Sequence, residues 1–591
     1  MDFQLWYTAA ILILLTVFLI KEWIEIEIVL FSAVMLLIIG NVISIKDAFA
    51  GFSNEGMLTI AMMFIVAGAL NNAGILRQIN PVIFGKGNDS PRLKLFRILI
   101  PTSAVSAFMN NTPVVAMLIP ALRTWAEKYH LAPSKFLIPI SYAAILGGMC
   151  TLIGTSTNLI VHGLMIDHGM KGIGFFEISK IGVPLAIIGV LFLVILGPRL
   201  LPERKEPMVE LGENTREFVI ELKVMPNYEN IGKTIEDAGM RHLTGLFLFQ
   251  IERDSRIIAP AHPDEIILPG DRLFFTGIPK TILEFKKTPG LALTEDAHFD
   301  IKQYDASQVK TFEGVISANS PLIGKTVRDS NFRGRYESVI IAIHRQGERI
   351  KRKVGDIVLR PGDTVLLLAE KNFRRKWYHS RDFFLIAGAE SVPSKPYWQR
   401  VISVAVFSIM ILLAVFEVLP LLSAAGLAVI VLLLTKVIRP PEIPQFIDWR
   451  VLIVIALSLG VAAAVEKSGL AEFLANSLVN FGISFGIFGI LTTIYILTSI
   501  YTTIITNNAA AALIFPVVYS ITAKLGADPK AFAMTIMIAA AASFATPISY
   551  QTNLMVYGPG GYKFKDFLKI GVPLQCFTGA CALILIYVYY L

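Results

Sequence analysis

Charged residues are scarce in this sequence. Asp, Glu, Lys and Arg supply 17% of the 591 residues, whereas hydrophobic residues supply 54%, and a typical soluble domain is about 25% charged. The apolar residues gather in blocks of about 20, the length that crosses a bilayer as a helix. Only residues 203–396 have the composition of a soluble protein. The sequence therefore predicts an α-helical polytopic membrane protein with a central soluble insert.

Signatures of enzymes and resident cofactors are also missing. The three cysteines, Cys150, Cys576 and Cys581, lie in apolar segments and predict neither a disulfide framework nor a zinc site. The segments Gly232-Lys233-Thr234 and Gly324-Lys325-Thr326 resemble the end of a nucleotide-binding loop but lack its upstream glycine. We therefore expect no catalytic residues, no cofactor and no nucleic-acid partner. The formal net charge of +8 is interpreted as a signal of membrane topology.

Hydrophobic blocks predict five membrane spans in each half of the chain. In the first half they are predicted at Leu5–Ile20, Glu27–Ile43, Met57–Ile75, Leu137–Met165 and Ile181–Leu196. In the second half they are predicted at Val401–Val418, Leu421–Ile438, Val451–Val465, Ala531–Tyr557 and Phe567–Tyr589. These blocks are expected to be helices, because the hydrocarbon core offers the backbone no other hydrogen-bond partners.

Two further apolar stretches, Leu93–His130 and Ile483–Lys524, are each interrupted by a polar pair. The pairs are Asn110-Asn111 in the first stretch and Asn507-Asn508 in the second. Such an interruption is typical of a re-entrant hairpin that enters the membrane and returns to the same side. We predict one hairpin in each half; the second stretch can also be read as a span that leads into its hairpin.

The two halves repeat short motifs in the same order. Lys-Ile-Gly-Val-Pro-Leu occurs at 180–185 and 569–574, and Thr-Asn-Leu at 157–159 and 552–554. Five spans per half would turn the second copy upside down, which is the inverted-repeat plan of many secondary transporters. We therefore predict membrane repeats at residues 1–202 and 397–591. Basic residues concentrate in the loops on one side, which predicts a cell (inner) membrane protein with a cytoplasmic insert.

The insert also repeats itself. Ile231–Asp237 is similar to Ile323–Asp329, and Leu268–Asp271 is similar to Leu359–Asp363. Short alternating strands and Pro-Gly-Asp turns predict two α+β domains, at residues 203–300 and 301–396. Because each copy is small for an isolated domain, we expect the copies to pack on each other or to dimerise, and the protein to be a homodimer in membrane lipid.

The predicted breaks carry the polar chemistry of the membrane halves. Gly, Pro, Ser and Thr also interrupt two later spans, at residues 147–158 and 543–553. Freed carbonyls with Asn and hydroxyl oxygens suit Na⁺, and helix N-termini suit an anion. Charged residues are nearly missing at mid-depth, which favours Na⁺ over H⁺ as coupling ion. Alternatively, the asparagines only join helices, and Gly and Thr only permit close packing.

With these breaks the chain resembles the divalent anion:sodium symporter (DASS) family, in the ion-transporter superfamily. That family carries Ser-Asn-Thr at each hairpin tip, aligned here with Asn110-Asn111-Thr112 and Asn507-Asn508-Ala509. The resemblance implies Na⁺ ligands at Ser106, Asn110, Asn111, Cys150, Thr503, Asn507, Asn508 and Ala545. It implies substrate-binding residues at Asn110, Asn111, Thr112, Thr151, Asn507, Asn508, Thr546 and Pro547.

The sequence departs from that motif at both tips, because Asn replaces the two serines and Ala509 replaces the second threonine. This loss favours a small tetrahedral oxyanion such as sulfate, with di- or tricarboxylates next. The insert resembles two regulator-of-potassium-conductance C-terminal (RCK_C, or TrkA-C) domains through its Ile-Gly-Lys-Thr and Pro-Gly-Asp repeats. That resemblance implies either a sensor for a small nucleotide effector or a dimerisation spacer.

Together these features predict a secondary active transporter for Na⁺-coupled symport of a small divalent anion, regulated by the RCK_C pair. The family resemblance implies elevator-type alternating access. Two alternatives are an arsenite or organic-acid carrier of the same superfamily and a passive ion channel regulated by the RCK_C pair. The lack of a potassium-filter sequence counts against the channel.

Overall fold

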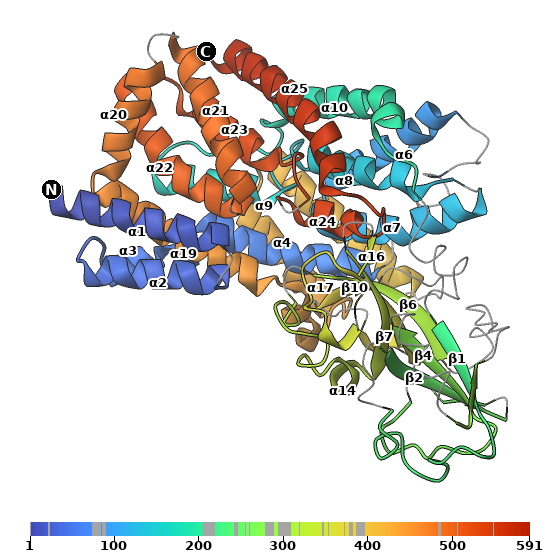
Figure 1. Ribbon diagram of the computed structural model, residues 1–591. Helices are drawn as coiled ribbons and strands as arrows, with labels where there is room; N and C mark the ends of the chain where they lie inside the picture. The colour runs from blue at the N-terminus through green and yellow to red at the C-terminus, as the bar shows by residue number, and fades with distance from the viewer. Residues whose placement is uncertain are drawn as a thin grey trace.

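A computed structural model describes residues 2–21, 24–73, 84, 90–129, 131–204, 219–240, 246–254, 256–258, 261–277, 289–293, 309–317, 320–345, 348–350, 352, 354–370, 373–377, 382–385, 396–482, 486–504, 506–547 and 549–591. Helices form the two halves of the chain, which pack against each other, and the insert that separates them in the sequence forms two small sheets below the helices (Figure 1). The predicted fold class is confirmed at this level. The predicted domain boundary between residues 300 and 301 lies outside the described residues.

The first half has a regular succession of helices. They are α1 (Asp2–Lys21), α2 (Ile26–Ile39), α3 (Ile45–Phe49), α4 (Glu55–Asn72), α6 (Pro91–Ser106), α7 (Asn111–Lys128), α8 (Leu137–Gly148), α9 (Ser156–Asp167) and α10 (Ser179–Leu200). The helix α4 is preceded by the 3₁₀ turn η1 (Ala50–Ser53).

The second half follows the same succession. Its helices are α16 (Tyr397–Val415), α17 (Leu421–Leu434), α18 (Ile443–Phe446), α19 (Trp449–Lys467), α20 (Leu470–Gly482), α21 (Gly486–Ile504), α22 (Asn507–Leu525), α23 (Pro529–Ala541), α24 (Gln551–Tyr557) and α25 (Phe564–Tyr590). Helix α20 was not among the predicted spans, because its polar residues interrupt the apolar run that marks a span.

Seven helical segments in the described part of the chain are long and apolar enough to cross a membrane. Shorter apolar helices include α2, α17 and α23. On α10, Val183, Ile187, Leu191 and Ile195 are 42–56% exposed at a spacing of four residues. Apolar side chains along one exposed helix face are expected where a helix meets lipid. The chain is therefore embedded in a membrane.

Both asparagine pairs interrupt helices, as the sequence predicted. Helix α6 ends at Ser106 and α7 begins at Asn111, while α21 ends at Ile504 and α22 begins at Asn507. The two later breaks are also present, between α8 and α9 and between α23 and α24. The re-entrant course of the hairpins and the inversion of the second half stay predictions.

The repeated Lys-Ile-Gly-Val-Pro-Leu motif has a packing role in both halves. A Cβ atom added at Gly182 would collide with the carbonyl oxygen of Met149, just after α8. A Cβ atom added at Gly571 would collide in the same way with the carbonyl oxygen of Phe544, after α23. Glycine therefore lets α10 and α25 approach the backbone of the two broken helices, which explains why this motif recurs.

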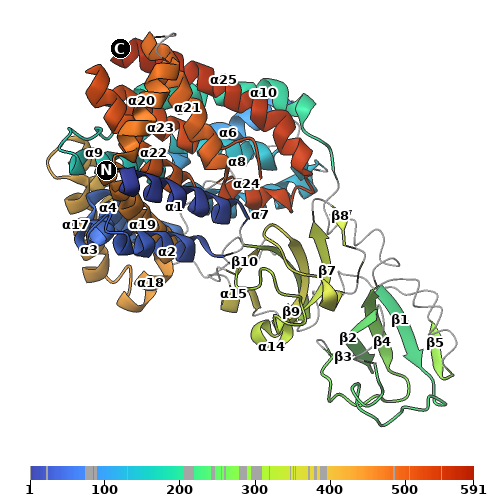
Figure 2. The ribbon, with the colours of Figure 1, turned by 60° about the vertical axis from the view of Figure 1, so that its left-hand side comes forward.

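The insert contains two antiparallel five-stranded sheets with one strand order. The first contains β1 (Val219–Val224), β2 (Leu246–Arg253), β3 (Arg256–Ile258), β4 (Arg272–Gly277) and β5 (Leu291–Leu293) in the order β3-β2-β4-β1-β5. The second contains β6 (Val309–Ile316), β7 (Ser338–Arg345), β8 (Glu348–Arg349), β9 (Thr364–Glu370) and β10 (Phe383–Leu385) in the order β8-β7-β9-β6-β10. Figure 2 shows the second sheet beside the helices and the first sheet farther out.

The repeated motifs of the insert stabilise turns. In the first copy the Thr234 hydroxyl accepts from the backbone N–H of Asp237 and donates to its carboxylate. Thr326 and Asp329 form the same pair in the second copy. The Gly-Lys-Thr segments thus form the same hydrogen-bonded turn in both copies. The RCK_C assignment itself stays a prediction.

Candidate functional site

The first hairpin tip is organised around Asn111, the first residue of α7. Its side chain is 1% exposed. The Ser106 hydroxyl, at the end of α6, donates to Asn111 Oδ1 over 2.7 Å. Asn110 Oδ1 accepts from the backbone N–H of Thr112 over 3.4 Å. The structure thus brings together four of the predicted residues, with Asn111 fixed across the break between two helices.

The second tip repeats this arrangement with a different register from the one predicted. The Thr502 hydroxyl donates to Asn507 Oδ1 over 2.6 Å, the counterpart of the bond from Ser106 to Asn111. Asn507 therefore corresponds to Asn111, and the second motif is Thr506-Asn507-Asn508. The predicted alignment with Asn507-Asn508-Ala509 was shifted by one residue. It was wrong because two adjacent asparagines occur at each tip and fit either register.

The shift also changes the hydroxyl that belongs to the second tip. Thr503, predicted as an Na⁺ ligand, donates to the carbonyl of Ile500 within its own helix. Thr502 is fully buried and contacts Asn507, the carbonyl of Ala540 and Ser543. Thr502, rather than Thr503, is thus the residue that joins this hairpin to the broken helix beside it.

An asparagine closes each broken helix. Asn158 Nδ2 donates to the Thr151 carbonyl over 3.0 Å, and Asn553 Nδ2 donates to the Thr546 carbonyl over 3.1 Å. Both asparagines are fully buried. Asn553 Oδ1 accepts from the Ser141 hydroxyl over 2.7 Å. Asn158 Oδ1 is also buried, but no described residue donates a hydrogen bond to it. The first half therefore has a free buried acceptor where the second half has none.

Each hairpin tip contacts the broken helix of the opposite half. From the first tip, Asn111 Nδ2 donates to the Tyr550 hydroxyl over 2.7 Å, and the Thr112 hydroxyl donates to Gln551 Oε1 over 3.1 Å. Tyr550 and Gln551 lie at the N-cap and first residue of α24. These contacts join residues about 440 positions apart in the sequence.

The second tip makes the reciprocal contact. Asn508 Oδ1 accepts from the hydroxyls of Ser156 and Thr157, each over 3.0 Å, in the first turn of α9. Thr155, the N-cap residue of α9, lies near the Tyr550 hydroxyl. Tyr550 therefore stands at the start of α24, accepts from the start of α7 and lies close to the start of α9.

The electrostatic consequence is favourable for an anion. The contacts above pair the N-terminus of α7 with that of α24, and the N-terminus of α22 with that of α9. A helix N-terminus carries roughly half a positive elementary charge and unpaired backbone N–H groups. None of the side chains in this network is charged. The positive potential that the helix termini create is therefore not neutralised by a carboxylate of the network.

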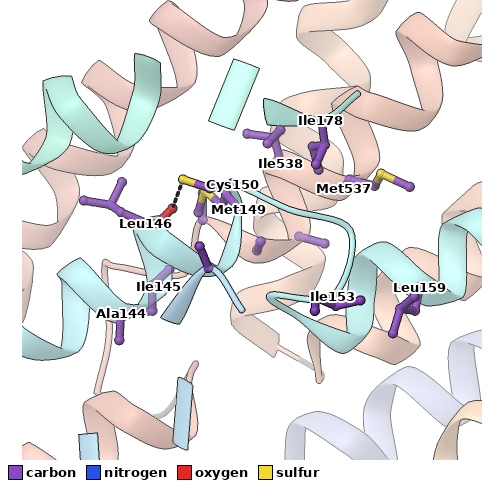
Figure 3. Close-up of a cluster of buried hydrophobic side chains, with 14 of the residues drawn as sticks. Ala144, Ile145, Leu146, Met149, Cys150, Ile153, Leu159, Ile178, Met537 and Ile538 are labelled. Atoms are coloured by element: carbon purple, nitrogen blue, oxygen red, sulfur yellow. Dashed lines mark hydrogen bonds between the residues drawn. The ribbon is translucent and has the colours of Figure 1, made fainter. Parts of the chain in front are cut away.

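Other predicted residues contribute backbone or lie beside the network. The Cys150 thiol donates to the Leu146 carbonyl over 3.5 Å and lies among apolar side chains that include Met149, Ile178 and Ile538 (Figure 3). Only its carbonyl is available to a polar partner, and Ser179 already donates to it. The Na⁺ role of Cys150 stays a prediction that its thiol does not support.

The remaining predicted residues lie in the two later breaks. The Thr151 hydroxyl donates to the Ala107 carbonyl in the first hairpin. The Ala545 N–H donates to Gln575 Oε1 over 3.1 Å, and the Thr546 hydroxyl accepts from the Ser549 N–H over 3.2 Å. Pro547, the next residue in the chain, is buried. Thr151 thus joins the break after α8 to the first hairpin. The bonds of Ala545 and Thr546 described here do not reach the second hairpin tip.

Sequence reasoning missed the residues that start the second helix of each break. These are Thr155, Ser156, Thr157, Tyr550 and Gln551. Their position directly after a Gly- or Pro-containing break, where N-cap and first-turn residues are expected, is the signal that could have identified them.

Comparisons with known proteins agree with this architecture. The family model described as citrate transporter (CitMHS) matches residues 16–537. A protein of Chlamydomonas reinhardtii named "Putative sulfur deprivation response regulator" is 38% identical over 566 residues, covering 94% of this chain and 97% of that protein. An uncharacterized transporter of Synechocystis sp. is 30% identical, covering 97% of this chain and 95% of its own length. Sodium/sulfate cotransporter 1 of Chlamydomonas reinhardtii is 26% identical, covering 91% of this chain and 84% of its own length.

The family match spans both membrane halves and the insert, and the predicted relation to sodium-coupled anion carriers is confirmed at the family level. Seven helical segments in the described part of the chain are long and apolar enough to cross a bilayer. The chain is therefore a membrane transporter that belongs to the citrate transporter (CitMHS) family.

Proposed function

We propose that this protein is a secondary active transporter that couples Na⁺ entry to the symport of a small divalent anion, with sulfate favoured over di- and tricarboxylates. One observation carries the proposal: each uncharged hairpin tip is hydrogen-bonded to the helix N-terminus of the opposite half. Such interrupted helices hold ions and substrates in many secondary transporters. A similarity to a sodium/sulfate cotransporter supports the choice of ion and anion.

The anion would be bound by the helix N-termini and by hydroxyl and amide donors around them. Asn111, Thr112 and Ser156 supply donors of this kind close to the starts of three helices. A tetrahedral dianion offers four acceptor oxygens in a compact volume. Tyr550 and Gln551 are large side chains at the positions where the first half has Thr155 and Ser156, so they leave less space for a longer carboxylate.

The cation would be bound by oxygen atoms of the breaks. Unwound backbone carbonyls and helix C-terminal ends are common Na⁺ ligands in transporters. The buried Asn158 Oδ1, to which no described residue donates, is a further oxygen, and it belongs to the side chain whose Nδ2 donates to the carbonyls of Gly148 and Thr151. A buried acceptor without a donor costs about 1–3 kcal/mol, and a bound cation would remove that cost.

The remaining expectations belong to the same proposal. The protein would lie in the cell (inner) membrane with its insert in the cytoplasm, because basic residues mark that side. The hairpins and broken helices would move against the other helices by an elevator-type motion. The insert would regulate transport through a small effector, and the protein would be a homodimer.

Uptake into proteoliposomes tests the proposal. Purified full-length protein is reconstituted, and labelled sulfate uptake is measured with an inward Na⁺ gradient, with K⁺ in place of Na⁺, and with an ionophore that removes the Na⁺ gradient. Accumulation of sulfate above equilibrium only while the Na⁺ gradient lasts is expected. Equal passive flux under all three conditions would identify a channel instead.

Citrate or another organic acid is a second candidate substrate, because the matching family model is that of citrate transporters. The same vesicles with labelled citrate and succinate decide between the two. Na⁺-driven accumulation of a carboxylate, with no accumulation of sulfate, would replace sulfate in the proposal and leave its mechanism intact.

A further inference from the structure

One face of the second insert sheet is turned toward the membrane helices. Glu313 and Val315 lie two residues apart on β6 and so share a face, and the antiparallel register places them opposite Leu366 and Thr364 of β9. All four side chains are 1–5% exposed. Val315 belongs to the apolar core of the membrane helices, whereas the other face of the sheet forms the core of the insert. In both views this sheet lies below α7 and α24 (Figures 1 and 2).

This face contacts the two helices that are joined at the candidate site. Arg123 of α7 forms an ion pair with Glu313, with 2.8 Å between Nη2 and Oε2 and with the two side chains 9% and 2% exposed. Gly558 ends α24, and a methyl group added there would collide with the Thr364 hydroxyl and lie 3.2 Å from the Gly362 carbonyl. One sheet thus holds α7 and α24, whose first residues contact each other above it.

Comparison with the first insert copy shows that only the second copy makes these contacts with the membrane helices among the described residues. Every equivalent residue lies 92 positions earlier: Glu221 corresponds to Glu313 and Arg272 to Thr364. Glu221 is paired within its own sheet, with 2.6 Å between its Oε1 and Arg272 Nε. In the second copy Thr364 supplies no cation, and the cation comes from Arg123 of the membrane half.

We propose that Glu313 and the segment 362–364 are positioning residues of the transport site. By holding α7 and α24 in a fixed relation, the second insert copy sets the contacts of Asn111 and Thr112 with Tyr550 and Gln551. We call the contacts of Arg123 with Glu313 and of Gly558 with residues 362–364 the clamp. An effector that changes the structure of the insert acts on transport through the clamp. The expected effect on sulfate uptake rests on the proposed function. The expected change in the contact between α7 and α24 does not.

Breaking the ion pair tests the clamp. Full-length Glu313→Gln and Arg123→Gln are expected to lower the ratio of Vmax to KM for Na⁺-driven sulfate uptake at least about tenfold, because a buried charge left without its partner costs more than the free energy that corresponds to a factor of ten. The charge exchange Arg123→Glu with Glu313→Arg is expected to restore most of the loss. Wild-type kinetics in both single variants would overturn the proposal.

The matched control is Glu221→Gln, which breaks the equivalent acid pair in the first copy. It is expected to leave sulfate uptake unchanged at equal protein level in the vesicles. An equal loss in Glu221→Gln and Glu313→Gln would show that any damage to the insert lowers transport, and the clamp would be rejected.

A substrate-independent measurement separates this inference from the proposed function. Cysteines placed at Thr112 and Gln551 report the contact between α7 and α24 through the rate of cross-linking by a short bis-maleimide. Glu313→Gln is expected to slow this cross-linking severalfold, whether or not sulfate is the substrate. An unchanged rate rejects the clamp, while a failure of Na⁺-driven uptake in the wild type rejects only the proposed function.

A second pair of variants guards against loss of folding. Gly558→Ala keeps an α-helical backbone, since φ is −66° and ψ is −55° at this position, but it pushes against Thr364. We expect reduced uptake in Gly558→Ala and partial recovery when Thr364→Ala removes the colliding hydroxyl. If a distant alanine substitution in β9 restored uptake in Gly558→Ala as fully as Thr364→Ala does, that result would contradict the clamp.

Discussion

The two membrane halves have equivalent internal contacts, but they differ in the residues through which they contact each other. Within each half, a hydroxyl in the first hairpin helix holds the central asparagine, Ser106 to Asn111 and Thr502 to Asn507. Between the halves, Tyr550 and Gln551 face one tip, whereas small hydroxyl residues face the other. Under the proposed function, the shared part would hold the coupling ion, and the part that differs would select the anion.

Removing the shared asparagines is the strongest test of this comparison. Asn111→Ala and Asn507→Ala should each lower Na⁺-driven sulfate uptake at least about 100-fold, which corresponds to ~2.7 kcal/mol. Each substitution removes a side chain that joins two helices at a break, and Asn111→Ala also removes the acceptor of the Ser106 hydroxyl. The measurement is initial uptake rate in proteoliposomes at matched protein content.

Asn476→Ala is the control for these variants, because Asn476 is exposed and contacts Lys524 at the surface. It should transport like the wild type. If Asn111→Ala or Asn507→Ala kept full Na⁺ dependence, the two tips would not be equivalent ion sites, and the comparison of the halves would lose its basis.

The bridge between the halves should give the next largest effect. Tyr550→Phe removes the hydroxyl that accepts from Asn111 Nδ2. A buried amide donor left unpaired costs about 1–3 kcal/mol, so a loss in uptake of roughly tenfold or more is expected. Tyr557→Phe, in the same helix, serves as the control. Full activity in Tyr550→Phe would mean that the halves are not coupled through this residue.

Making the second half resemble the first should change selectivity more than rate. Gln551→Ser introduces the residue found at the equivalent Ser156 and empties the space beside Thr112. We expect the ratio of sulfate to succinate uptake to fall severalfold, because the site can then admit a longer anion. Competition of unlabelled succinate against labelled sulfate measures this ratio. An unchanged ratio would place the selectivity elsewhere.

The smallest effect is expected from a pH-sensitive contact between His168 of the first half and Glu466 of the second half. His168 follows α9, and its Nε2 lies 3.1 Å from Glu466 Oε2 of α19. The hydrogen bond to Glu466 raises the pKa of His168 above its usual 6.5. A raised folded-state pKa stabilises the protein below about pH 6.5, and this stabilisation is lost as the pH rises through the folded value.

Because Glu466 is 43% exposed, the contribution should stay below about 1 kcal/mol. The thermal midpoint of the wild type should therefore fall slightly between pH 6 and pH 8, and His168→Gln should flatten that slope. An identical pH slope in the variant would show that other groups cause it. The equivalent position in the second half is Lys563, so no imidazole stands there.

The sequence predicted the helical halves, the insert and the four helix breaks well, because these features are local. Apolar runs, Gly-Pro-Ser-Thr interruptions and Pro-Gly-Asp turns act within a few residues of themselves. It placed α8 and α9 inside one interrupted span and gave the second hairpin no firm boundary. It also aligned the second tip one residue late, because both registers of an Asn-Asn pair look alike.

What the sequence determined by itself is the set of elements: which segments can lie in lipid, where their helices stop, and that uncharged amides and hydroxyls occupy the stops. Which of these helix ends contact each other depends on the tertiary structure. The contacts of Asn111 with Tyr550 and of Arg123 with Glu313 join residues about 440 and about 190 positions apart. No local preference encodes such pairs, since they form only when packing of the helices and of the second insert sheet brings them together.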